Sequence, residues 1–209
     1  LDKLPYLERS QLECELKCEL NEFFLITLHP ETCRPGRVLA GAKLLLPFLR
    51  QHYPSTKLLI TGANADPEGE KINAWLKQQA KRDTEHIYFY AGLGRLRYLS
   101  AAHLARCVIG NSSSGIIELP SLGIPVLDLG NRQQGRLRSD AVLSADFTSE
   151  NIANALNKLL NPDWLKKCAT IANPYEGKDS AKTIARIIKE FDLSLINRDK
   201  VFFDLPISL

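Results

Sequence analysis

The feature that most constrains the fold of this chain is the alternation of short, continuously apolar segments with longer amphipathic ones. Residues 23–28 read Phe-Phe-Leu-Ile-Thr-Leu, a pattern typical of a strand that is buried on both faces. Residues 36–52 instead carry Val38, Ala42 and Leu45 at the spacing of one helix face. Buried strands separated by helices form a parallel sheet that is covered on both sides. The alternation therefore predicts an α/β fold, a doubly wound, Rossmann-like parallel sheet with right-handed crossovers.

The same criterion sets the boundaries of the elements along the chain. Strands are predicted over residues 23–28, 57–61, 87–90, 107–109 and 124–129. Helices are predicted over residues 8–20, 36–52, 67–82, 95–104, 114–122, 149–160, 163–171 and 179–191. Residues 130–140, the arginine loop below, are expected to form a polar loop, and the end of the chain a mixed tail.

Length, composition and charge limit the classes of protein to which this chain can belong. A chain of 209 residues with 44% apolar residues is long enough for one domain with its own core, or at most two. The net charge of +3 gives no electrostatic reason to expect nucleic acid as a partner. No apolar run approaches the ~20 residues of a membrane span, and the first residues carry no signal-peptide pattern. We therefore expect neither nucleic acid nor a membrane as a partner.

Two residue counts add to these expectations. The sequence contains no Met, which predicts a fragment or a processed chain. Its five Cys residues form no C-x2-C pair, so neither a disulfide framework nor a zinc site is indicated. Reduced, mostly buried thiols in a cytoplasmic protein are the simplest interpretation.

The most informative segment is the serine loop, residues 110–115, which reads Gly-Asn-Ser-Ser-Ser-Gly. It follows a predicted strand and opens a predicted helix, where free backbone N–H groups and the helix dipole favour a phosphate. It lacks both the Gly-Lys-Ser/Thr of a Walker loop and the G-x-G-x-x-G of a dinucleotide turn. Helix capping alone is the alternative, because Ser and Asn are common N-caps.

Glu118 favours nucleotide binding over capping alone. It does not lie three residues after Ser113 or Ser114, where a capping box would need it. It lies four residues after Ser114, on the same predicted helix face. A carboxylate beside a phosphate site suits the hydroxyls of a ribose, so the loop is interpreted as a nucleoside diphosphate site.

Other polar residues follow the predicted strands and should gather at the same edge of the sheet. His29 follows residues 23–28 directly and either acts on a phosphate or a proton, or is structural. The arginine loop carries Arg132, Arg136 and Arg138, whose guanidinium groups suit phosphate oxygens, although a solvated basic loop is an equal alternative for Arg138. Asn64 lies in a turn that its side chain alone could explain.

Taken in order, these segments resemble a known family. They read TLHPET (27–32), ANAD (63–66), GNSSSGIIE (110–118), and GIP (123–125) followed by GNRQQGR (130–136). Together they are similar to the carboxyl-terminal half of hydrolysing UDP-N-acetylglucosamine 2-epimerases, over about residues 23–191. That family has a two-domain, glycosyltransferase-B-like fold with the active site between the domains. The resemblance implies a helix or interdomain segment at 1–22, a UDP-binding Rossmann-like domain at 23–191 and a C-terminal tail at 192–209.

The resemblance also implies roles for individual residues. The serine loop holds the diphosphate, mainly through Ser113 and Ser114; Glu118 binds the ribose, and Leu93 lies against uracil. His29 faces the sugar and diphosphate and is the catalytic candidate. The implied UDP-binding residues are Asn64, Leu93, Asn111, Ser112, Ser113, Ser114, Gly115, Glu118, Arg132 and Arg136.

The family reaction removes the C2 proton of the sugar, expels UDP to give a glycal, and adds water to release N-acetylmannosamine. The acid and base carboxylates are expected in a missing N-terminal domain, so this half is expected to bind UDP and to be inactive alone. The expected partners are a UDP-sugar and that domain, a homo-oligomer is left open, and no cofactor or metal is expected. Sialic-acid-type sugar biosynthesis is the implied pathway. The alternatives are the nucleotide-binding half of a UDP-sugar glycosyltransferase of the same fold, and a non-catalytic sugar-nucleotide-binding module.

Overall fold

A six-stranded parallel sheet forms the centre of the computed structural model, which describes residues 4–177, 179–192 and 194. The chain divides into two units, residues 1–176 and 177–209, and the sheet belongs to the first. Its strands are β1 (Phe23–Thr27), β2 (Lys57–Thr61), β3 (Ile87–Tyr90), β4 (Cys107–Gly110), β5 (Val126–Leu129) and β6 (Val142–Ala145). They lie in the order β3-β2-β1-β4-β5-β6, and every neighbouring pair is parallel. This is the predicted doubly wound arrangement, and its strand order reverses between β1 and β4.

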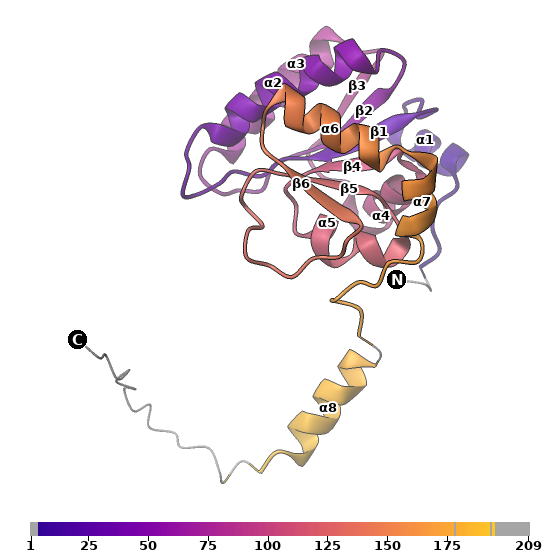
Figure 1. Ribbon diagram of the computed structural model, residues 1–209, viewed down its shortest axis with the longest axis vertical. Helices are drawn as coiled ribbons and strands as arrows, with labels where there is room; N and C mark the ends of the chain where they lie inside the picture. Colours follow the sequence, from indigo (N-terminus) through magenta and orange to yellow (C-terminus); the bar gives the residue numbers. More distant parts are fainter. Residues whose placement is uncertain (1–3, 178, 193, 195–209) are drawn as a thin grey trace, which may run out of the picture. The chain divides into compact units, whose positions relative to one another are not determined.

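Helices cover both faces of this sheet (Figure 1). The helices of the first unit are α1 (Arg9–Leu16), α2 (Arg37–His52), α3 (Gly69–Arg82), α4 (Gly94–Leu104), α5 (Ser114–Ile117), the 3₁₀ turn η1 (Leu119–Leu122), α6 (Ser149–Leu159) and α7 (Pro162–Cys168). Helices α2, α3 and α6 pack in one apolar cluster, and α1, α4 and α5 in the other. Within β1, Phe24 and Ile26 face the first cluster, whereas Phe23 and Leu25 face the second. The continuous apolar pattern of β1 is thus explained by burial on both faces.

The second unit contains α8 (Ser180–Glu190), close to the predicted helix 179–191. The helix is amphipathic, and its Ile184, Ile187 and Ile188 side chains are exposed. The predicted tail lies outside the described residues except for Asp192 and Ser194, and the predicted domain boundaries at 22 and 191 stay predictions. Among the helices of the described residues, none is long and apolar enough to cross a membrane.

Three element predictions need correction. Strand β6 was not predicted, because it is a four-residue edge strand whose sequence, Val-Leu-Ser-Ala, is only partly buried. The predicted helix 8–20 ends at Leu16, because Lys17 adopts a left-handed conformation with φ 52°. The predicted helix 114–122 is divided into α5 and η1, since Pro120 has no N–H to continue the α-helical hydrogen bonds.

Candidate functional site

The site lies where the strand order reverses, at the carboxyl ends of β1 and β4. Thr27 and Gly110 are paired in register at the ends of these strands. Gly110 has φ +148°, and a Cβ atom there would collide with the backbone oxygen of Thr27. Only glycine permits this close approach, which brings the serine loop against the end of β1.

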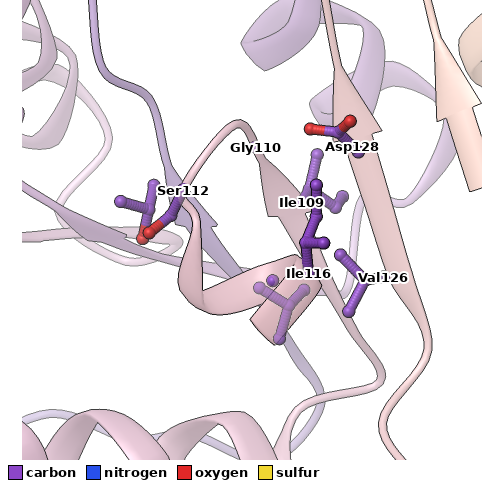
Figure 2. A pocket seen from close by; sticks show the side chains of 9 residues that line it. Ile109, Gly110, Ser112, Ile116, Val126 and Asp128 are labelled. Carbon is purple, nitrogen blue, oxygen red and sulfur yellow. The ribbon is translucent and has the colours of Figure 1, made fainter. Parts of the chain in front are cut away.

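Packing beneath the serine loop fixes where α5 begins. Figure 2 shows the loop leaving β4 at Gly110 and turning into α5, where Ile116 lies near Val126 of β5 beside a small pocket. A Cβ atom on Gly115 would lie 3.0 Å from Val126 Cγ1. Gly115 therefore lets α5 pack closely on β5, and this packing role differs from the predicted contact with the nucleotide.

A cavity of about 350 Å³ opens beside the serine loop and is called the serine cavity below. It brings together residues from four strand ends. Its predicted site residues are His29, Leu93, Ser112, Ser114 and Glu118, and its other lining residues include Thr27, Arg95 and Tyr98. Residues as distant in sequence as His29 and Glu118 therefore meet at one place.

Hydroxyl and carboxylate groups line one side of the serine cavity. Ser114 Oγ is buried, and it has no hydrogen-bond partner among the described residues. The ion pairs formed within the described part of the chain do not include Glu118. The Glu118 carboxylate is therefore free of ion pairs within the described residues, and Ser114 Oγ has unused hydrogen-bonding capacity. Because α5 is only four residues long, the helix dipole contributes less here than the predicted nine-residue helix would.

His29 is held in one orientation by its neighbours. Its backbone N–H donates to Asn111 Oδ1 at 2.7 Å, and Asn111 Nδ2 donates to the His29 carbonyl at 2.8 Å. The ring Nδ1 accepts from the backbone N–H of Asn64 at 3.1 Å. Because Nδ1 is an acceptor, the neutral ring carries its proton on Nε2.

The electrostatic surroundings keep His29 neutral. Burial lowers the pKa of His29 from 6.5 to about 4; the charge of Arg132 acts in the same direction, and Asp66 opposes it. In the site without ligand at neutral pH, His29 is therefore a neutral side chain that can donate a hydrogen bond through Nε2.

Asn111 stabilises the loops around the site. It is fully buried, and its side chain is occupied by the backbone of His29. Its own carbonyl accepts hydrogen bonds from Gln133 Nε2 at 2.8 Å and Arg132 Nη1 at 3.2 Å. Asn111 thus ties the loop after β1, the serine loop and the arginine loop to one another.

The arginines of the loop after β5 fall in different places. Arg132 lines a neighbouring cavity of about 400 Å³ together with Glu31 and Asp66. Arg136 is exposed and lines none of the cavities found in the described part of the chain. Arg138 bonds the buried Asp128 at 3.4 Å, the Ser144 hydroxyl and the Gln133 carbonyl. Arg138 therefore holds the loop in place, which is neither of the roles considered for it.

Two further predicted residues lie outside the serine cavity. Asn64 is exposed, its Nδ2 donates to Asp66 Oδ2 at 2.6 Å, and it lines a separate cavity of about 450 Å³. Ser113 is the N-cap residue of α5 and makes no side-chain capping bond.

Within the serine cavity, Leu93 is only 3% exposed and packs in the apolar cluster of α1, α4 and α5, so little of its surface is free for a base.

Arg95 and Tyr98 line the serine cavity but were not predicted. Both lie in the first turns of α4, directly after the end of β3. The signal that could have found them is the Gly92-Leu93-Gly94 turn, since it follows a strand as the serine loop does.

The cysteines differ in exposure and do not form a site. All five are free; Cys107 and Cys168 are buried, Cys14 and Cys33 are exposed, and Cys18 is intermediate. The prediction of mostly buried thiols was therefore wrong. Within the described ranges, no group of three or more His, Cys, Asp or Glu side chains could hold a metal ion.

Comparisons with known proteins agree with the geometry. Residues 1–189 match the family model described as UDP-N-acetylglucosamine 2-epimerase. A GDP/UDP-N,N'-diacetylbacillosamine 2-epimerase (hydrolyzing) from Campylobacter jejuni is 32% identical over 78% of this chain and 42% of its own length. The polysialic acid biosynthesis protein P7 of Escherichia coli is 28% identical over 95% of this chain and 50% of its own. The chain thus spans about half the length of the curated relatives it matches.

Comparison with solved structures also finds UDP-GlcNAc 2-epimerases. The crystal structure of UDP-GlcNAc 2-epimerase from Neisseria meningitidis bound to UDP-GlcNAc matches with a TM-score of 0.63 and 21% identity, covering 87% of this chain and 48% of that one. The sheet and its helices therefore match half of a protein with the glycosyltransferase-B-like fold, as was predicted. The match to the family model over residues 1–189 shows that this chain belongs to the UDP-N-acetylglucosamine 2-epimerase family.

Proposed function

We propose that the chain is the nucleotide-binding half of a hydrolysing UDP-N-acetylglucosamine 2-epimerase and that the serine cavity binds UDP. The observation that carries the proposal is the convergence of His29, Ser114 and Glu118 on one cavity at the switch point of the sheet. The names of the Campylobacter and Neisseria proteins support a UDP-sugar as the ligand.

Each group in and beside the cavity fits one part of the nucleotide. The hydroxyls of Ser112 and Ser114 suit phosphate oxygens, and the guanidinium of Arg132 next to the cavity adds positive charge. The Glu118 carboxylate suits the two hydroxyls of a ribose. The predicted UDP contacts of three residues have less support. The Asn64 side chain is bonded to Asp66, and Leu93 is buried in the core. Arg136 lies away from the cavities of the described residues.

His29 suits the departure of the diphosphate. As UDP leaves the sugar, negative charge grows on the phosphate oxygen, and a fixed donor stabilises that charge without reorganising. The neutral His29 ring can donate from Nε2, because Asn111 fixes its backbone and Asn64 occupies Nδ1. The acid and base that remove and return the sugar proton are proposed to lie in the other half of the enzyme.

The substrate of the whole enzyme is proposed to be UDP-N-acetylglucosamine or a di-N-acetylated relative, with N-acetylmannosamine or its counterpart and UDP as products. The name of the Campylobacter relative includes hydrolysis, and that of the Escherichia coli relative includes polysialic acid biosynthesis. The first name supports a hydrolysing reaction, and the second supports a role in sialic-acid-type sugar synthesis. The five free thiols support a cytoplasmic location, where cysteines stay reduced.

Calorimetry of UDP with the purified chain tests the proposal. We expect UDP to bind, with uridine and phosphate each binding more weakly, and we expect no release of UDP from UDP-N-acetylglucosamine. No binding of UDP would contradict the assigned site, and turnover would contradict the assignment of the catalytic carboxylates to another domain.

Reconstitution with the N-terminal half of a relative separates the epimerase from its alternatives. An epimerase releases UDP from UDP-N-acetylglucosamine without an acceptor. A glycosyltransferase requires an acceptor sugar, and a binding module releases no UDP at all.

A further inference from the structure

Two buried hydroxyl groups in the serine cavity lack hydrogen-bond partners. The Tyr98 hydroxyl of α4 and the Ser114 Oγ of α5 are both enclosed, and neither forms a hydrogen bond within the part of the chain that the structure describes. Both residues line the serine cavity. Because most buried polar atoms in folded proteins are hydrogen-bonded, a neighbouring pair without partners requires an explanation.

The surroundings of Tyr98 consist of other hydroxyl groups. The side chains of Ser114, Thr27 and Ser112 are near enough to the phenol oxygen to lower its pKa, but none of them meets the geometry of a full hydrogen bond to it. Burial raises the pKa of Tyr98 and these hydroxyls oppose the shift, so the phenol keeps its proton and can donate. Thr27 Oγ1 is held by a hydrogen bond to Thr61 Oγ1 at 2.6 Å, whereas Ser114 Oγ has no partner within the described residues, so Ser114 is the neighbour that can gain one.

The serine loop can adjust at these residues while its start is fixed. Gly110 and Asn111 are held by the end of β1 and by the backbone of His29. Beyond them, α5 is only four residues long; the Ser113 carbonyl accepts from the backbone N–H groups of Ile116 and Ile117, but its side chain makes no capping bond. A small shift confined to residues 112–114 would therefore leave the sheet and the His29 clamp intact.

We propose that Tyr98 is a positioning residue for the diphosphate. When a nucleoside diphosphate enters the serine cavity, residues 112–114 shift, the Tyr98 hydroxyl donates a hydrogen bond to Ser114 Oγ, and the Ser114 hydroxyl donates its own hydrogen to a phosphate oxygen. Each hydroxyl has one hydrogen to donate, so the chain of bonds runs in one direction. Chains of this kind strengthen each member. The inference rests on the proposed function and extends it to a residue that no strand-end motif contains.

The substitution Tyr98→Phe tests the inference, because it removes only the hydroxyl. We expect the free variant to melt at the wild-type temperature or slightly above it, since an unpartnered buried group is removed. We expect its affinity for UDP, measured by calorimetry, to fall about tenfold. Tyr88→Phe is the matched control: its hydroxyl donates to the Glu85 carbonyl at 3.1 Å outside the serine cavity, so its UDP affinity should be unchanged.

Two further measurements locate the effect on the phosphates. NMR titration with uridine, which reaches weak affinities, should give the same affinity for Tyr98→Phe and wild type. The double variant Tyr98→Phe, Ser114→Ala should bind UDP no more weakly than Ser114→Ala alone, because Tyr98 acts through Ser114.

Several results would overturn the inference. The first is an unchanged UDP affinity of Tyr98→Phe, whether or not the free variant loses stability. The second is a loss of uridine affinity as large as the loss of UDP affinity. The third is that the effects of Tyr98→Phe and Ser114→Ala on UDP affinity add up in the double variant. Failure of the wild-type chain to bind UDP would overturn the proposed function together with the inference. An unaffected Tyr98→Phe in a chain that binds UDP would overturn the inference alone.

Discussion

The serine loop and the arginine loop leave neighbouring strands at the same edge of the sheet, yet they use their polar side chains differently. In and after the serine loop, Ser114 Oγ has no hydrogen-bond partner within the described residues, whose ion pairs also do not include Glu118. In the arginine loop, Arg138 is bonded to Asp128, and Gln133 Nε2 is bonded to the carbonyl of Asn111, although Gln133 Oε1 has no partner within the described residues. Side chains that the protein leaves unbonded are available to a ligand, whereas bonded side chains hold the loops in place. Charge alone would have favoured the arginine loop as the main binding element.

The largest effect is expected at Asn111, where the two loops meet. The variant Asn111→Ala leaves the backbone N–H and carbonyl of His29 without their buried partners, so the free energy of unfolding should fall by about 4 kcal/mol. Chemical denaturation measures this change, with Asn157→Ala on the exposed surface of α6 as the control. Wild-type stability of Asn111→Ala would contradict the role of this residue as the link between the loops.

The next effect concerns pH and His29. The pKa of His29 is about 4 in the folded protein and 6.5 in the unfolded chain, so the unfolded chain binds the proton first as the pH falls. Stability from this group is present above pH 6.5 and should decrease by about 3 kcal/mol as the pH falls to 4. The variant His29→Gln should lose correspondingly less stability over this range, whereas His52→Gln, at an exposed position in α2, should behave as wild type. Equal pH dependence of His29→Gln and wild type would contradict a neutral, buried His29.

At Glu118 we expect a substitution to weaken UDP binding without changing the stability of the protein. The variant Glu118→Ala should weaken UDP binding by about 30-fold, or about 2 kcal/mol, because hydrogen bonds to a charged group are lost. Its melting temperature should remain that of wild type, since the carboxylate has no ion pair within the described residues to lose. Calorimetry and thermal unfolding test both statements, with Glu19→Ala before β1 as the control. A stability loss with unchanged UDP affinity would place Glu118 among the structural residues.

The opposite result is expected at Arg138. The variant Arg138→Ala leaves the buried Asp128 carboxylate without its cation, so the free energy of unfolding should fall by about 1–2 kcal/mol at pH 8. Burial raises the pKa of Asp128 to about 6, so the loss should be smaller at pH 5, where this group is protonated. Denaturation at both pH values measures it. Loss of UDP affinity without loss of stability would make Arg138 a ligand-binding residue.

The smallest effect is expected at Arg136, which is exposed and lines none of the cavities in the described ranges. Arg136→Ala should change stability by less than about 0.5 kcal/mol, as surface substitutions usually do. Its UDP affinity should also change less than about twofold, which calorimetry can measure. A tenfold loss of affinity would restore the predicted contact between Arg136 and UDP.

The fold was largely predictable because its central strands are buried on both faces. Such strands, β1 among them, carry an uninterrupted apolar pattern that a sequence displays directly. The edge strand β6 lacks this pattern, since it contains Ser144 and is only partly covered. The break between α5 and η1 was missed although Pro120 was visible in the sequence.

The candidate site was less predictable, because strand-end motifs identify the edge of the sheet but not the direction of each side chain. Ser112 and Ser114 line the serine cavity, whereas the adjacent Ser113 does not. Asn111 belongs to the same motif, yet its side chain bonds the backbone of a histidine 82 residues away. Tyr98 reaches the cavity from α4; the Gly92-Leu93-Gly94 turn marks the strand end before it, but only tertiary packing decides that the Tyr98 side chain faces the cavity.

The bonds of Asn111 have a consequence for how much order a nucleotide must impose on this protein. One buried amide residue fixes the main chain around His29 and accepts hydrogen bonds from Arg132 and Gln133. The segments after β1, β4 and β5 are therefore held together before a ligand binds, so binding removes little conformational entropy there. The purified chain should therefore present these strand ends in the arrangement that they have in the structure.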